Sequence, residues 1–164
     1  MSTKDFSSKQ EKMIAAYLGW SVVSGSGSRP CHPGDIIGDD WLGECKTHTS
    51  SGNSIFFSSE VWKKICDEAM FQHRNPVLFT DDGSQKLDRT WCIINSFTVD
   101  DTWKVIPLNK KFRSNITMKH DDLKGLYSVD NIISGIADRS CYSVDLKGTK
   151  VVILPIILFN HMIQ

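Results

Sequence analysis

Residues 24–48 read SGSGSRPCHPGDIIGDDWLGECKTH, and this stretch decides both the fold and the candidate site. Two short apolar runs within it flank the turn sequence Gly-Asp-Asp, which predicts a β-hairpin. Asp35 stands at the start of the first run, and Glu44 and Lys46 lie two residues apart in the second. Because side chains alternate between the two faces of a strand, Glu44 and Lys46 should leave the same face, with Asp35 beside them.

Two carboxylates and an ammonium group on one small patch suit a hard divalent cation and a water molecule. Phosphodiester hydrolysis needs such a patch, because the cation neutralises the non-bridging oxygens and makes hydroxide available near neutral pH. Asp35 and Glu44 are the candidate metal ligands, joined by the backbone carbonyl of Cys45. Lys46 would orient or deprotonate the attacking water. The side chain of Cys45 should point to the opposite face and pack as a small buried thiol.

Length and composition indicate a single globular domain over residues 1–164. Formal net charge is zero because 19 basic side chains balance 19 acidic ones, which argues against a tail-driven DNA binder but permits a local basic groove. Five cysteines without a CxxC pair indicate reduced thiols of a cytoplasmic protein. The longest apolar run, 151–159, is too short to span a bilayer and contains Pro155, so it predicts a buried strand.

The remaining pattern predicts an α/β fold in which helices flank a mixed β-sheet. Ser8 and Glu11 have the spacing of a capping box, which predicts a helix from Ser8 to a stop at Gly19. A second helix should begin at Ser58 or Ser59 and cross between two strands. Strands are expected over residues 20–23, 35–37, 41–47, 76–80, 89–97, 102–106, 141–146 and 150–159, with a polar segment over 108–126 and a weak helix over 128–137.

The order of a capped helix, a Gly/Ser loop, Asp…Glu-x-Lys on strands and an amphipathic helix resembles the PD-(D/E)xK nuclease superfamily. Within it, GSGSRPCHPGDIIGDDWLGECKTH followed by SSEVWKKICDEA is similar to small phage-encoded enzymes related to archaeal-type Holliday junction resolvases. The resemblance covers residues 8–80 and implies a restriction-endonuclease-like mixed sheet, to which the C-terminal half would add extra strands. One departure is that Gly34 separates the proline of the motif from Asp35.

This resemblance implies a Mg²⁺- or Mn²⁺-dependent DNA endonuclease that cleaves branched duplex DNA as a homodimer. Asp35, Glu44 and Lys46 would form its catalytic and metal-binding core. Such resolvases also carry a glutamate on the first helix that joins the metal site, and Glu11 occupies that place. The alternative for Glu11 is that it only closes the capping box at the start of the helix.

Further candidates would contact DNA. A serine of the glycine-rich loop is functional in these resolvases, and glycines would let backbone amides approach a phosphate, although the loop also fits a flexible connector. A lysine on the second helix could meet a phosphate or simply be solvated. The basic stretch 104–113 could extend the DNA surface. The specific candidates are Ser26, Ser28, Arg29 and Lys64.

Other interpretations of the same residues stay open. Four potential zinc ligands occur within a short span but match no ribbon or finger spacing, namely Cys31, His32, Cys45 and His48. Asp39 and Asp40 are rival metal ligands, although their position at a turn favours solvated side chains. The enzyme could also be a sequence-specific restriction-type or end-trimming nuclease, or the chain could be a non-catalytic DNA-binding module on a nuclease fold.

Overall fold

The computed structural model describes residues 3–25, 33–49, 52–108, 114–123 and 139–164. Its strands are β1 (Ser21–Val22), β2 (Ile36–Ile37), β3 (Trp41–Lys46), β4 (Ser54–Ser58), β5 (Asn75–Asp81), β6 (Thr90–Asn95), β7 (Lys104–Pro107), β8 (Asn115–Lys119), β9 (Ser140–Leu146) and β10 (Thr149–Pro155). Its helices are α1 (Thr3–Leu18), α2 (Ser59–Phe71), α3 (His120–Leu123) and α5 (Ile156–Ile163), with 3₁₀ turns η1 (Leu87–Arg89) and η2 (Ser96–Thr98).

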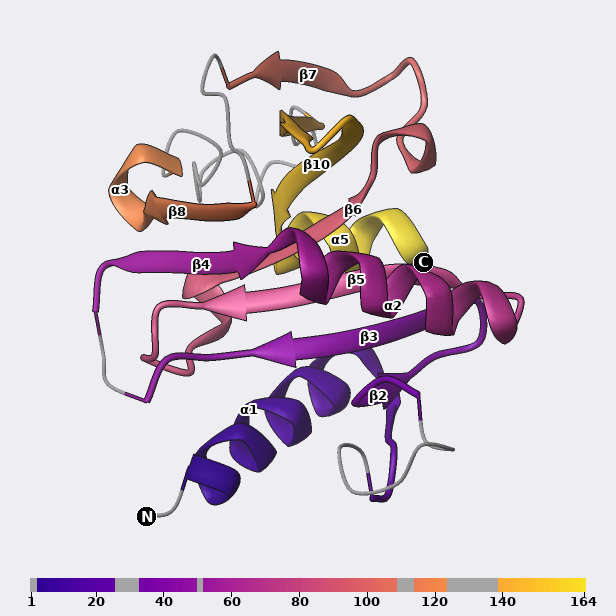
Figure 1. The fold of residues 1–164 in the computed structure, drawn as a ribbon, viewed down its shortest axis with the longest axis vertical. Helices are drawn as coiled ribbons and strands as arrows, with labels where there is room; N and C mark the ends of the chain where they lie inside the picture. The colour runs from indigo at the N-terminus through magenta and orange to yellow at the C-terminus, as the bar shows by residue number, and fades with distance from the viewer. Residues whose placement is uncertain (1–2, 26–32, 50–51, 109–113, 124–138) are drawn as a thin grey trace.

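Eight of these strands form one mixed sheet in the order β1-β2-β3-β5-β6-β10-β9-β7 (Figure 1). β3 is parallel to β5 and β7 is parallel to β9, while the other neighbouring strands are antiparallel. β4 and β8 pair with each other as a separate antiparallel ribbon. The prediction of an α/β fold with a mixed sheet and flanking helices is therefore confirmed.

Apolar layers cover both faces of the sheet. In β5, Val77 and Phe79 pack in one layer with residues of α1 and α5, whereas Leu78 packs in the other with residues of α2 and of the β4–β8 ribbon. β6 and β10 alternate between the same two layers. Because both faces are buried, the central strands are apolar along most of their length rather than alternating with polar residues.

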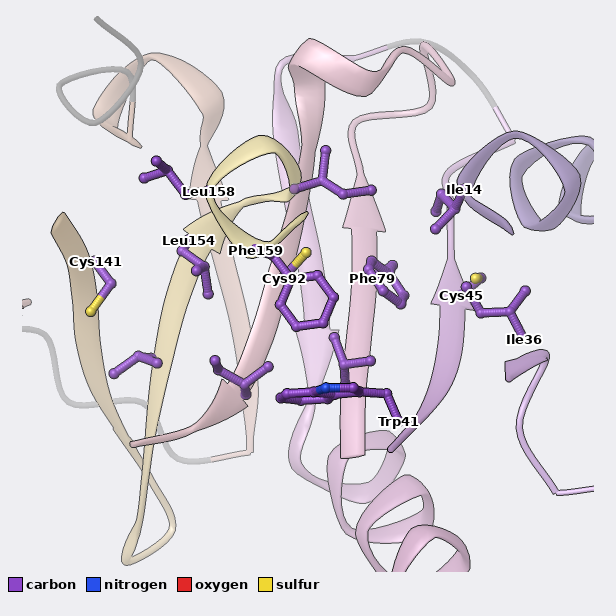
Figure 2. Packing of buried hydrophobic residues seen from close by; sticks show 14 of the residues in the cluster. Ile14, Ile36, Trp41, Cys45, Phe79, Cys92, Cys141, Leu154, Leu158 and Phe159 are labelled. Atoms are coloured by element: carbon purple, nitrogen blue, oxygen red, sulfur yellow. The ribbon is translucent and has the colours of Figure 1, made fainter. Parts of the chain in front are cut away.

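One aromatic cluster lies at the centre of the layer formed with α1 and α5 (Figure 2). The ring of Phe159 on α5 meets the rings of Trp20, Trp41 and Phe79 edge-on, with centroid separations of 6.0, 5.0 and 5.7 Å. Edge-to-face contacts of this kind are favoured by the ring quadrupoles. The C-terminal helix thus packs directly against β3 and β5.

α1 begins earlier than the sequence pattern predicted. The helix extends N-terminally beyond Ser8, so Ser8 and Glu11 lie inside it and do not cap its start. The predicted capping box is therefore wrong, and so is the alternative role of Glu11 as a capping residue. The helix ends as predicted, because Gly19 has a φ of 71° and the N–H of Trp20 donates to the carbonyl of Ala15 at 2.8 Å.

α2 confirms the predicted second helix and its crossover. The hydroxyl oxygen of Ser58 accepts a hydrogen bond from the N–H of Val61 at 3.2 Å and so caps the helix. Trp62, Ile65 and Ala69 form its buried stripe. Figure 1 shows α2 lying along β3 and β5, the two parallel strands that flank this crossover.

The C-terminal run is only partly a strand. β10 ends at Pro155, and the apolar residues that follow form α5, so the prediction of one strand over 150–159 is wrong. The predicted strand over 89–97 is shortened to β6, between the turns η1 and η2. β4 was not predicted, and β8 lies in the segment that was expected to be only polar. The predicted helix over 128–137 falls outside the described residues.

No helix in the described part of the chain is both long enough and apolar enough to cross a membrane.

Candidate active site

The predicted hairpin is confirmed as β2 and β3, and it places Asp35 beside β3. Asp35 immediately precedes β2, and its Oδ2 accepts a hydrogen bond from the N–H of Cys45 at 2.8 Å. Its own N–H donates to the carbonyl of Gly43, and its carbonyl accepts from the N–H of Val23, each at 2.8 Å. Hydrogen bonds on both sides of the chain therefore fix the position of Asp35.

Glu44 and Lys46 leave the same face of β3, as the two-residue spacing predicted. Nζ of Lys46 lies 2.7 Å from Oε1 of Glu44. The Glu44 side chain is only 4% exposed, while that of Lys46 is 44% exposed. Cys45 points to the opposite face and joins the apolar layer there, where burial raises the pKa of its thiol well above the usual range.

α2 adds two charged residues to this site. Nζ of Lys64 lies 3.2 Å from Oε2 of Glu44 and 3.6 Å from Oε1 of Glu68. Oε2 of Glu68 accepts a hydrogen bond from the N–H of Gly34 at 2.9 Å. From the sequence, Lys64 was predicted only as a DNA contact, and Glu68 was not predicted. The signal for Glu68 was its position four residues after Lys64, which places the two side chains next to each other on a helix.

Glu11 approaches the site from α1. Partial burial raises the pKa of Glu11, and the negative charges of Asp35 and Glu44 raise it further, against the opposing effect of Lys46. The preceding residue, Gln10, is fully buried and donates from Nε2 to the carbonyl of Lys46 at 3.0 Å. Gln10 was not predicted, and its hydrogen bond ties α1 to the end of β3.

The donor atoms at this site fit a hard divalent cation. Asp35 and Glu44 offer carboxylate oxygens. The N–H and the carbonyl of one strand residue point to the same side of the strand. The N–H of Cys45 donates to Asp35, so the Cys45 carbonyl is also directed toward the side of β3 on which Asp35 lies. The described residues contain no group of three or more His, Cys, Asp and Glu side chains arranged to hold a metal. Mg²⁺ does not require one, since it is usually bound by one or two carboxylates and keeps several waters.

The other predicted candidates divide into those that the structure describes and those outside the described residues. Asp39 and Asp40 are exposed in the turn between β2 and β3, in agreement with the expectation of solvated side chains. His48 is exposed, and its ring lies edge-on to that of Phe56 with a centroid separation of 6.4 Å. Cys45 is buried in the apolar layer. These two potential zinc ligands therefore point into different surroundings. The candidates outside the described residues are Ser26, Ser28, Arg29, Cys31, His32 and the basic residues within 109–113.

A second polar cluster follows the ends of β3 and β5, which meet at one edge of the sheet because the two strands are parallel. The Thr47 hydroxyl donates to Oδ1 of Asp81, and burial raises the pKa of Asp81. Asp82 pairs with Arg89. Burial alone would raise the pKa of Asp82, but hydrogen bonds from Ser84 and Arg89 and the positive charge of Arg89 lower it below its ordinary value.

The residues that converge at the end of β3 therefore come from three elements: the helix α1, the β2–β3 hairpin and the helix α2. They combine buried and half-buried carboxylates with two ammonium groups. No protein-family model, curated protein or solved structure matches this chain.

Proposed function

We propose that this protein is a metal-dependent DNA endonuclease that hydrolyses phosphodiester bonds in branched duplex DNA, as a Holliday junction resolvase does. The single observation that best supports this is the convergence of Asp35, Glu44 and Lys46 at the end of β3. In this proposal the β2–β3 hairpin, α2 and β5 form a restriction-endonuclease-like core, and β9 and β10 belong to the C-terminal extension of the sheet.

Each residue has a role that follows from its surroundings. Asp35, Glu44 and the Cys45 carbonyl would hold Mg²⁺ or Mn²⁺, with Glu11 beside them. When bound, the cation supplies charge for the non-bridging phosphate oxygens and lowers the pKa of a coordinated water. Lys46 is oriented by Glu44 at 2.7 Å, and its half-exposed ammonium can hold the attacking water or offset charge developing on the phosphate.

Selectivity for junctions and assembly as a homodimer follow from the resemblance of residues 8–80 to junction resolvases. Two symmetric cuts require two active sites, which a twofold dimer supplies. Ser26, Ser28 and Arg29 would then contact the DNA backbone.

The experiment is a cleavage assay with Mg²⁺ on a four-way junction, a linear duplex and a single strand of matched sequence. Paired nicks at the branch point are expected. Asp35→Asn, Glu44→Gln and Lys46→Ala should each lower the rate by about 100-fold or more. Asp39→Asn is the matched control, because it removes an exposed carboxylate from the same hairpin and should leave the rate unchanged.

Each other outcome identifies a different function. Cuts at one sequence in linear duplex would indicate a restriction-type enzyme, and shortening from the ends would indicate a trimming nuclease. Binding of DNA without cleavage would indicate a non-catalytic module. Cleavage that survives all three substitutions would refute the assignment of the site.

A further inference from the structure

Both carboxylate oxygens of Glu44 contact an ammonium group. Oε1 lies 2.7 Å from Nζ of Lys46, and Oε2 lies 3.2 Å from Nζ of Lys64. The Glu44 side chain is almost fully buried. The two lysines thus come from different elements, β3 and α2, and approach the same carboxylate from its two oxygens.

Lys64 has a second acceptor close at hand. Oε1 of Glu68 lies 3.6 Å from its Nζ, one helical turn farther along α2. The Lys64 side chain is 54% exposed, so it can move from Glu44 toward Glu68 without entering the core. Glu68 is held in place, because its other oxygen accepts the hydrogen bond from the N–H of Gly34. Glu68 is therefore a fixed acceptor beside a movable cation.

We propose that Lys64 and the divalent cation compete for Oε2 of Glu44, and that cation binding shifts Lys64 toward Glu68, where its ammonium contacts a DNA phosphate. This inference rests on the proposed function, because it takes Glu44 to be a metal ligand. Repulsion between a divalent cation and an ammonium group on one carboxylate is the reason for the shift. Glu68 lies against Gly34, the residue before Asp35, so the shifted ammonium stays at the site.

The competition has a signature that a purely structural role for Lys64 does not have. Removing the Lys64 charge should strengthen metal binding, because the competitor at Glu44 is gone. The same change should weaken DNA binding, because a phosphate contact is lost. A residue that only supported the fold would weaken both.

α2 provides a matched control one residue away. Lys63 forms an ion pair with Asp67 at 2.8 Å, with the same four-residue spacing as Lys64 and Glu68. Its side chain is 77% exposed, and it pairs with Asp67 on α2. Lys63→Met therefore removes the same charge from the same helix without removing a contact to the site.

The first test is calorimetric titration of the full chain with Mn²⁺ in the absence of DNA. Lys64→Met should lower the dissociation constant roughly three- to tenfold, the range expected of a partly exposed charge pair, while Lys63→Met should change it less than about twofold. Lys64→Arg keeps the charge and should bind Mn²⁺ no more tightly than the native protein. Tighter binding by Lys64→Arg, or an unchanged constant for Lys64→Met, would overturn the inference.

The second test is the anisotropy of a labelled four-way junction, titrated in Ca²⁺ at several salt concentrations. Lys64→Met should weaken binding and reduce the slope of log affinity against log salt by about one. An unchanged slope would show that Lys64 makes no phosphate contact. If the native protein binds no Mn²⁺, the proposed function itself fails. If it binds Mn²⁺ and only the Lys64 results differ, the proposed function stands and this inference is wrong.

Discussion

Replacing Phe159 with alanine should remove a large part of the folding free energy, because α5 places this ring in the centre of an apolar layer. Phe159 is 0% exposed and meets three other aromatic rings edge-on. Truncating a buried phenylalanine to alanine costs about 3–5 kcal/mol through lost burial and the remaining cavity. Each aromatic pair adds about 0.5–1.5 kcal/mol beyond burial. Three such pairs place the expected loss near the top of the first range, at about 5 kcal/mol.

The measurement is urea-induced unfolding followed by tryptophan fluorescence, with the free energy extrapolated to water. Phe97→Ala is the matched control, because Phe97 is 80% exposed and the chemical change is the same. The control should alter the unfolding free energy by less than about 0.5 kcal/mol. A loss below about 2 kcal/mol for Phe159→Ala, well under the range for buried rings, would refute the packing of α5 against the sheet. Equal losses in the two variants would refute it as well.

Two further substitutions test the surroundings of the site. Because the pKa of Asp82 is lowered in the folded protein, its ionised form stabilises the fold at pH values above the ordinary aspartate pKa of about 3.9. This stabilisation is lost as the pH falls through the lower pKa that Asp82 has in the folded protein. Asp82→Asn should therefore lower the free energy of unfolding by about 1–3 kcal/mol at pH 7 and reduce the loss of stability in acid. Unfolding curves between pH 7 and pH 2 will measure both effects. If the native protein and the variant lose stability equally as the pH falls, the pair of Asp82 with Arg89 is not the cause of the pH dependence. Gly43→Ala should destabilise the protein by about 1–3 kcal/mol, because the added Cβ would lie 2.8 Å from side chains of both β2 and β5. Thermal unfolding measures the effect, with Gly52→Ala as the control, because a Cβ at Gly52 would lie 3.6 Å from its nearest atom. An equal loss of stability in the two variants would contradict the steric explanation.

The central part of the site could be predicted because it depends on local rules. Asp35, Glu44 and Lys46 belong to one hairpin, and alternation along a strand determines which side chains share a face. The turn between the two strands is short, so their pairing follows from neighbouring sequence. The burial of Cys45 on the opposite face follows from the same alternation.

The remaining contacts depend on packing between distant segments. The helical pattern of α2 predicts that Lys64 and Glu68 share a side, but not that this side meets Glu44. Gln10 reaches the carbonyl of Lys46 only because α1 lies against β3 in the folded chain. Neither the contact between Lys64 and Glu44 nor that between Gln10 and Lys46 can be predicted from the sequence around either residue.

The missed secondary structure has equally specific causes. β4 and β8 pair across a long separation in sequence, for example Phe57 with Ile116, so neither strand is closed by a local turn. Residues 156–159, directly after Pro155, are all apolar, and periodicity alone does not distinguish a buried helix from a buried strand in such a short run. The start of α1 was placed too late because a Ser-x-x-Glu spacing also occurs inside helices.

The contact between Trp41 and Phe159 has a consequence for how the protein is made. The candidate site residues from Glu11 to Glu68 are made before α5, yet the strand that carries Glu44 packs through Trp41 against a ring of α5. Translation halted near residue 155 would yield a chain with every candidate residue of the site but without the helix that supports β3. A stable candidate site thus requires that α5 has been made, although α5 carries none of the candidate residues.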